Sequence, residues 1–112
     1  MSWGYSSNNK YKNRKTEYNG EMYDSKREAQ VAMDLDLMLK AKEIRDYKRQ
    51  VNYKLYGINN GYICTHRVDF VVTNNDGSKA VWEVKGLETK DWVIKKNLFE
   101  DNYPYIKYIV IK

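Results

Sequence analysis

The chain has 112 residues, enough for one domain with a modest hydrophobic core. Charged residues make up 31% and hydrophobic residues 42%, which excludes a disordered chain, and no apolar run approaches the ~20 residues that span a bilayer. A net charge of +5 is equally compatible with a nucleic-acid partner and with an ordinary solvated surface.

The cysteine content and the first residues bear on location. The chain has a single cysteine, Cys64, which cannot form an internal disulfide, and this favours a reducing, cytoplasmic setting. The first ten residues contain no apolar stretch, so we expect no secretory signal. We likewise expect no membrane partner.

The chain begins with a segment rich in Ser, Asn, Lys and Tyr. Residues 1–13 have no apolar period, so we expect a flexible basic arm followed by a single domain over residues 14–112. Asn19-Gly20 supplies the positive φ angles of a two-residue type I′ turn. This turn predicts a hairpin over residues 16–23.

A helix is expected next. Ser25 and Glu28 have the spacing of a capping box, and the helix should run to about Lys42. Its apolar positions recur at three and four residues, and Glu28, Ala32, Leu35 and Leu39 fall on one stripe. Glu28 should therefore lie at the N-terminal end of the buried face.

The remaining elements follow from hydrophobic period and turn residues. Strands are predicted over residues 47–56, 62–73, 79–85 and 105–111, with turns at 57–61 and 75–77. Thr89 can cap a second helix that runs to about Glu100. A strand, helix, strand crossover makes the last strand parallel to the one before it. The expected fold class is α+β with an α/β core, in which helices flank a three-stranded antiparallel meander joined by a parallel strand.

Three charged residues are expected to share one face of this sheet. Glu83 and Lys85 are two apart on one strand, so their side chains leave the same face. A three-residue turn at 75–77 sets a register in which Asp69 falls directly opposite Glu83. A turn one residue longer or shorter would put Asp69 on the other face.

Two carboxylates this close repel, and a divalent cation between them resolves the conflict. Hard oxygen ligands suit Mg²⁺ or Mn²⁺, with Asp69 and Glu83 as ligands and the Val84 carbonyl as a further candidate. Lys85 could hold an attacking water or neutralise a pentavalent phosphate. The alternative is an exposed Glu83–Lys85 salt bridge beside a surface aspartate. The apolar neighbours of both acids favour the metal site, because charges inside apolar strands are costly unless paired or metal-bound.

Other polar residues have plainer explanations. Glu28 is, on spacing alone, as well explained by helix capping as by a place in the site. His66 and Cys64 share the strand face opposite Asp69, and without two further ligands they make no zinc site, so we assign them no role.

Four short segments occur in a fixed order: Tyr23–Ala29 (YDSKREA), Gln50, Val68-Asp69-Phe70 and Glu83–Gly86 (EVKG). This order resembles the small phage-encoded PD-(D/E)XK endonucleases, a family that includes Holliday-junction-resolvase-like proteins, over roughly residues 10–112. Val68 stands where the motif has Pro. The resemblance implies a PD-(D/E)XK nuclease-like fold and a Mg²⁺-dependent endodeoxyribonuclease acting in the host-cell cytoplasm. It implies that Asp69 and Glu83 bind the metal, that Lys85 is catalytic, and that Glu28 completes the acidic cluster.

The expected partner is DNA. We expect the protein to recognise the shape of the DNA through its phosphates, because one small domain offers little room for base-sequence readout. The candidate DNA-binding residues are Lys10, Lys12, Arg14, Lys15, Gln50, Lys90, Lys95 and Lys96. We expect a homodimer that acts on branched DNA such as a four-way junction. Resolving a junction needs two cuts on opposed strands, and a two-fold dimer supplies two equivalent sites. The alternatives are a non-catalytic nucleic-acid-binding module of the same fold, a sequence-specific restriction or homing-type nuclease, and, a distant third, a protein-interaction domain.

Overall fold

In the computed structural model, residues 15–112 are described. The chain divides into two compact units, one of residues up to Leu37 and one from Met38 to Lys112. The predicted basic arm, with Lys10, Lys12 and Arg14, lies outside the described residues. Within residues 15–112, no helix is long and apolar enough to cross a membrane.

The smaller unit begins with the predicted hairpin. Strands β2 (Thr16–Tyr18) and β3 (Glu21–Tyr23) pair antiparallel. Asn19 and Gly20 between them have φ angles of +55° and +83°, as a type I′ turn requires. The hairpin prediction is confirmed.

Helix α1 (Lys26–Lys40) starts at the predicted capping box. Ser25 Oγ accepts a hydrogen bond from Glu28 N at 3.0 Å, and Glu28 Oε1 accepts one from Asp24 N at 3.0 Å. The first bond satisfies one of the amides that a helix N-terminus leaves unpaired, and the second ties the residue before the cap to the first turn of the helix. Glu28 is buried, as predicted.

The C-terminal end of α1 differs from the prediction. The helix stops at Lys40 because Lys42 takes a left-handed φ of +60° and its amide bonds to Leu39 O at 3.1 Å. Leu39 lies in this last turn and is 37% exposed, so its predicted burial is wrong. The buried apolar face instead consists of Ala29, Val31, Ala32 and Leu35.

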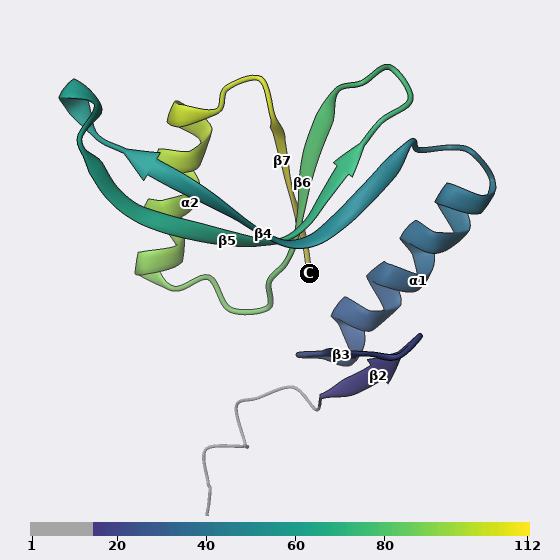
Figure 1. Cartoon of the computed structure of the whole chain (residues 1–112). Coiled ribbons are helices and arrows are strands. Elements are labelled where there is room, and N and C mark those ends of the chain that lie inside the picture. Colours follow the sequence, from purple (N-terminus) through teal and green to yellow (C-terminus); the bar gives the residue numbers. More distant parts are fainter. Residues whose placement is uncertain (1–14) are drawn as a thin grey trace, which may run out of the picture. The chain divides into compact units, whose positions relative to one another are not determined.

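The larger unit contains a mixed four-stranded sheet of order β4-β5-β6-β7. The strands are β4 (Asp46–Tyr56), β5 (Tyr62–Thr73), β6 (Lys79–Val84) and β7 (Lys107–Ile111). The first three form an antiparallel meander, and β7 runs parallel to β6, as the crossover argument predicts. Figure 1 shows β4 and β5 running side by side as a long, curved two-stranded ribbon. The protein is therefore α+β, with the predicted strand order.

The turns of the meander form as expected. Asn74 N donates to Ser78 O at 2.8 Å across the 75–77 loop, and Gly77 takes a left-handed φ of +90°. At the other turn, the 3-10 helix η2 (Ile58–Asn60) is closed by a hydrogen bond from Gly57 N to Gly61 O at 2.9 Å. The first of these turns fixes the register on which the site depends.

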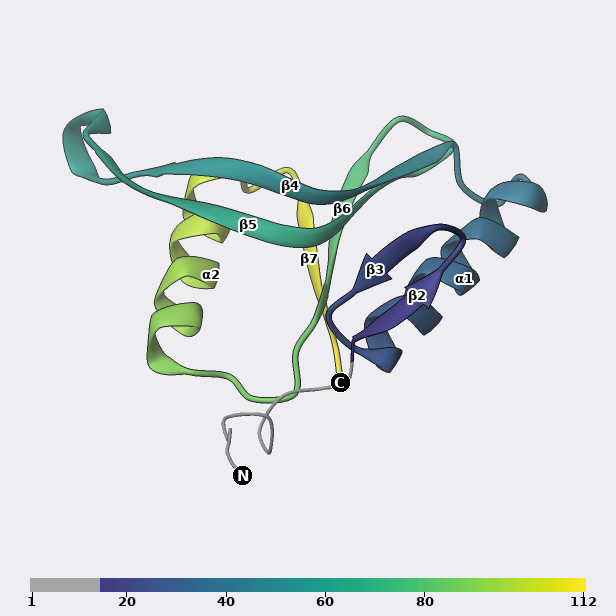
Figure 2. The same cartoon turned by 60° about the horizontal axis from the view of Figure 1, so that its bottom comes forward.

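Helix α2 (Lys90–Asn102) begins at the predicted cap, where Thr89 Oγ1 accepts a hydrogen bond from Trp92 N at 3.2 Å. It lies against the sheet beside the β4–β5 ribbon in both views (Figures 1 and 2). Phe99 of α2 is fully buried, and Tyr53 of β4 meets its ring edge-on at 5.0 Å. The helix therefore holds one face of the sheet rigid.

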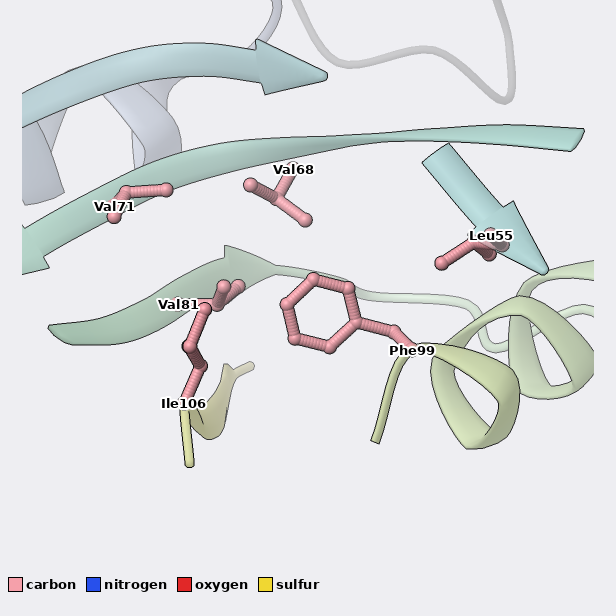
Figure 3. Packing of buried hydrophobic residues seen from close by; sticks show 6 residues of the cluster. All are labelled: Leu55, Val68, Val71, Val81, Phe99 and Ile106. Carbon is pink, nitrogen blue, oxygen red and sulfur yellow. The ribbon is translucent and has the colours of Figure 1, made fainter. Parts of the chain in front are cut away.

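The core between α2 and the sheet is apolar (Figure 3). Its buried members are Leu55, Val68, Val71, Val81, Phe99 and Ile106. Full burial of each such side chain contributes about 1.5–3 kcal/mol. Because Val68 directly precedes Asp69 in β5, this core fixes the backbone that carries the first carboxylate.

Candidate functional site

The carboxylates of Asp69 and Glu83 lie where the backbone pairing of β5 with β6 ends. That pairing runs from Thr73–Lys79 to Phe70–Trp82, and Asp69 and Glu83 are the next positions in the same register. Asp69 N donates to Glu83 Oε1 at 2.9 Å, and Val84 N donates to Asp69 Oδ2 at 2.8 Å. At this end of the ladder, side-chain oxygens therefore accept the hydrogen bonds of backbone amides. The predicted register of β5 with β6 is confirmed.

Burial makes this pair electrostatically demanding. Glu83 is only 5% exposed and Asp69 is half-buried. Transferring a carboxylate from water into a protein interior is costly unless hydrogen bonds or a counter-charge compensate. The amides of Asp69 and Val84 provide charge-assisted bonds, and Trp92 Nε1 donates to Glu83 Oε2 at 3.3 Å. The two acids are thus held with defined orientation and close together.

Lys85 follows on the same strand face, one step beyond the end of β6. Its backbone amide donates to Ile111 O at 2.9 Å, which continues the pairing with β7. Its Nζ lies 5.6 Å from the centroid of the Trp92 ring, within the range of a cation–π contact. The side chain is half-buried.

Gln50 marks a break in the neighbouring ladder. The register of β4 with β5 pairs Arg49 with Phe70 and Val51 with Val68, so Gln50 falls opposite Asp69 but is not paired with it in the ladder. Gln50 is exposed and has a left-handed φ of +54° inside an 11-residue strand. Such a conformation costs a non-glycine residue about 1–2 kcal/mol and is found preferentially at functional sites. The sequence singles out Gln50 only by resemblance, and no local motif signals its conformation.

His66, for which the sequence predicts no role, is buried in the same unit. A hydrogen bond of 2.9 Å joins His66 Nε2 to the Tyr108 hydroxyl, and His66 is 4% exposed. Burial, reinforced by the positive charges of Lys95 and Lys85, lowers the pKa of His66 to about 4. Burial also raises the pKa of Tyr108. Both side chains are therefore neutral near pH 7 and act as packing residues behind the site.

Two predicted metal ligands, Val84 and Glu28, make hydrogen bonds that explain them without a metal. Val84 contributes its amide to Asp69, whereas a metal-binding role for its carbonyl stays a prediction. Glu28 belongs to the smaller unit, where its carboxylate accepts from Asp24 N, so the structure shows it as a capping residue. Its place in an acidic cluster stays a prediction.

The chemistry of the donor set fits a hard divalent cation. Mg²⁺ takes one or two carboxylates and fills the rest of its shell with water and phosphate oxygens, which matches the Asp69 and Glu83 pair. In the part of the chain that the structure describes, no group of three or more His, Cys, Asp or Glu side chains is arranged to hold a metal. The site therefore offers two acidic ligands within one unit.

The predicted phosphate-binding lysines differ in their surroundings. Lys96 pairs with Glu100 at 3.0 Å and lies 5.3 Å from the Tyr108 ring centroid. Lys95 is half-buried near His66, Lys90 is exposed, and Lys15 lies 3.7 Å from an oxygen of Asp24. Part of the positive charge on α2 is thus offset within the helix.

Comparison with known proteins gives a family and no activity. A family model described as a protein of unknown function (DUF1064) matches residues 8–112, so the chain belongs to this family. No curated protein and no solved structure matches the chain.

Proposed function

We propose that this member of the DUF1064 family is a metal-dependent endonuclease that hydrolyses DNA phosphodiester bonds. The observation that carries the proposal is a pair of hydrogen bonds at the end of the β5–β6 ladder, from Asp69 N to the Glu83 carboxylate and from Val84 N to the Asp69 carboxylate. A sheet needs no charged pair there, since ordinary backbone pairing would satisfy the same amides without burying charge. A buried acidic pair beside a lysine is instead typical of a site that binds a cation and a phosphate.

Each residue has a defined part in this mechanism. Asp69 and Glu83 would hold Mg²⁺ or Mn²⁺, with Glu28 and the Val84 carbonyl as further proposed ligands. When bound, the ion supplies Lewis-acid activation of water and of the phosphodiester. Lys85 places its ammonium where it offsets the negative charge that grows on the phosphate oxygens during in-line attack. Water adds to phosphorus as the bond to the leaving sugar oxygen breaks.

The proposed substrate is branched DNA. Lys90 and Lys95 lie on α2, the helix that also carries Trp92 next to Glu83, so they can contact phosphates flanking the scissile bond. Lys10, Lys12, Arg14, Lys15, Lys96 and Gln50 are further proposed DNA contacts. A homodimer acting in the cytoplasm would place two such sites on a four-way junction.

The test is a cleavage panel of four-way junction, flap, nicked, linear and single-stranded DNA with Mg²⁺, with and without EDTA. Asp69→Asn should lower the cleavage rate by about 1,000-fold, because the loss of a metal ligand removes several kcal/mol of transition-state stabilisation. Asp76→Asn is the matched control, since Asp76 is an exposed acid in the turn of the same hairpin. Cleavage that survives EDTA or the Asp69 change would refute the mechanism.

A second candidate is a DNA-binding module without turnover. It is favoured by one observation, the absence of a three-ligand acidic group in residues 15–112. Such a protein would bind DNA with an affinity that falls steeply with salt and would show no Mn²⁺ site at Asp69 and Glu83. Calorimetric titration with Mn²⁺ separates the two candidates.

The oligomeric state has its own measurement. Light scattering over a range of concentrations should give the mass of a dimer, and junctions should be cut faster than the matched linear duplex. A monomer that nicks linear duplex as fast as junction would exclude the junction-resolving dimer and leave the sequence-specific nuclease as the alternative.

A further inference from the structure

We infer that Trp92 is a positioning residue that orients Glu83 and Lys85 together. The inference rests on the proposed function and adds a residue that neither the acidic motif nor the family match identifies. Trp92 lies in the first turn of α2 and is 6% exposed. One side chain thus contacts two of the groups proposed to bind metal and phosphate.

The two contacts use different parts of the indole. Trp92 Nε1 donates to Glu83 Oε2 at 3.3 Å in a buried environment. The ring lies under Lys85, whose Nζ is 5.6 Å from its centroid. Indole has one N–H donor and an electron-rich face, so a single ring can serve an anion at its edge and a cation on its face.

The indole is itself held in place. Thr89 Oγ1 fixes the backbone of Trp92 through the helix cap, and Tyr108 meets the indole at 6.4 Å with an interplanar angle of 66°. Tyr108 is in turn bonded to His66. The donor to Glu83 therefore comes from a rigid, buried wall rather than from a mobile surface side chain.

The consequence for Glu83 is a fixed carboxylate. Oε1 accepts from Asp69 N and Oε2 accepts from Trp92 Nε1, so both oxygens are oriented before any ligand binds. Outer-sphere donors of this kind typically contribute 10–100-fold to metal affinity or activity. For Lys85, the ring face restricts a long side chain that is otherwise free to adopt many rotamers.

Two variants separate these contributions. Trp92→Phe keeps an aromatic face for Lys85 but removes the N–H donor, whereas Trp92→Leu removes both. We expect Trp92→Phe to weaken Mn²⁺ binding about 10-fold and to lower kcat with little change in KM for DNA. Trp92→Leu should lower kcat further. Trp82→Phe is the matched control. Trp82 directly precedes Glu83 in β6, so its side chain lies on the opposite face of the sheet.

A spectroscopic measurement tests the contact independently of activity. In a ¹H–¹⁵N spectrum, the indole signal of Trp92 is identified by its disappearance in Trp92→Phe. Glu83→Gln removes the charge from the acceptor, so this signal should move upfield while the Trp82 indole signal stays in place. Thermal unfolding of each variant confirms that it is folded before metal and DNA are added.

The outcomes distinguish the inference from the proposed function. A Trp92 signal that ignores Glu83→Gln, or a folded Trp92→Phe protein with wild-type Mn²⁺ affinity and kcat, overturns the positioning role. If the wild-type protein binds no Mn²⁺ and cuts no DNA, the proposed function fails and the catalytic meaning of the contact fails with it. In that case the indole signal still decides whether Trp92 fixes Glu83.

Discussion

The two ends of the β5–β6 pair solve the same problem in opposite ways. At the hairpin end, Asn74 N bonds to Ser78 O, and the polar side chains of the turn bond to one another in water. At the open end, the amides of Asp69 and Val84 bond to carboxylate oxygens. One end is ordinary backbone pairing, and the other depends on which side chains are present.

This difference shows where the chain accepts an electrostatic cost. The acid of the turn, Asp76, is exposed, and hydrogen bonds from Ser78 lower its pKa. The acids of the open end are half-buried or buried and lie side by side, where like charges repel. Substitutions at the hairpin end should therefore act on backbone geometry, and those at the open end on charge and ligand binding.

The largest expected effect on stability concerns His66, which precedes Asp69 by three residues in β5 and so lies toward the open end. Its folded pKa is lowered to about 4, so the unfolded chain binds more protons between that pH and about 6.5. Stability should be complete above pH 6.5 and should fall as the pH drops toward 4, by about 3 kcal/mol at most. Urea unfolding at several pH values measures this fall in the free energy of unfolding.

His66→Gln is the variant for that comparison, because Gln keeps a polar group near Tyr108 without titrating. The groups that face the imidazole are Tyr108, Lys95 and Lys85. The difference in stability between wild type and His66→Gln should change with pH only over this range. A pH-independent difference would show that His66 is not held neutral by its surroundings.

The next effect is metal stabilisation of the open end. Mn²⁺ at 100 times its Kd should raise the free energy of unfolding by about 2.7 kcal/mol, and EDTA should reverse it. Glu83→Gln should remove this gain, while Asp76→Asn at the hairpin end should keep it. Equal stabilisation of wild type and Glu83→Gln would place the ion elsewhere.

A smaller effect is expected from glycine placed at two positions of β4. Gln50 has a left-handed backbone, so Gln50→Gly should be neutral or stabilising by about 0.5 kcal/mol. Asn52→Gly, at an exposed position two residues along the strand, should destabilise by about 0.5–1 kcal/mol. Denaturant midpoints of the two variants give the contrast, and equal losses would argue against strain at Gln50.

The smallest effect on DNA cleavage is expected at the turn of the hairpin end. Gly77 has a φ of +90°, and an added Cβ would meet only Arg45 Nη1 at 3.7 Å, an ordinary contact. Gly77→Ala should therefore cost about 1–2 kcal/mol of stability, from backbone strain alone, without changing DNA cleavage. A loss of cleavage in a folded Gly77→Ala protein would mean that the turn and the open end are coupled more tightly than their separate chemistry implies.

By itself the sequence determined the features set by neighbouring residues. Asn19-Gly20 fixes its turn through permitted φ angles, Ser25 and Thr89 cap their helices, and the 75–77 loop sets the register that puts Asp69 opposite Glu83. Each depends on atoms a few residues apart. Local stereochemistry is therefore enough to predict them.

Only the tertiary structure decided the rest. Two hydrogen bonds join positions on different elements, one from Trp92 to Glu83 and one between His66 and Tyr108, so no local pattern signals them. The left-handed backbone of Gln50 has no local sequence signal either. The exposure of Leu39 was likewise decided by where the chain leaves α1. Packing selects among conformations that a short segment finds nearly equal in energy, and that choice becomes visible only when distant parts of the chain meet.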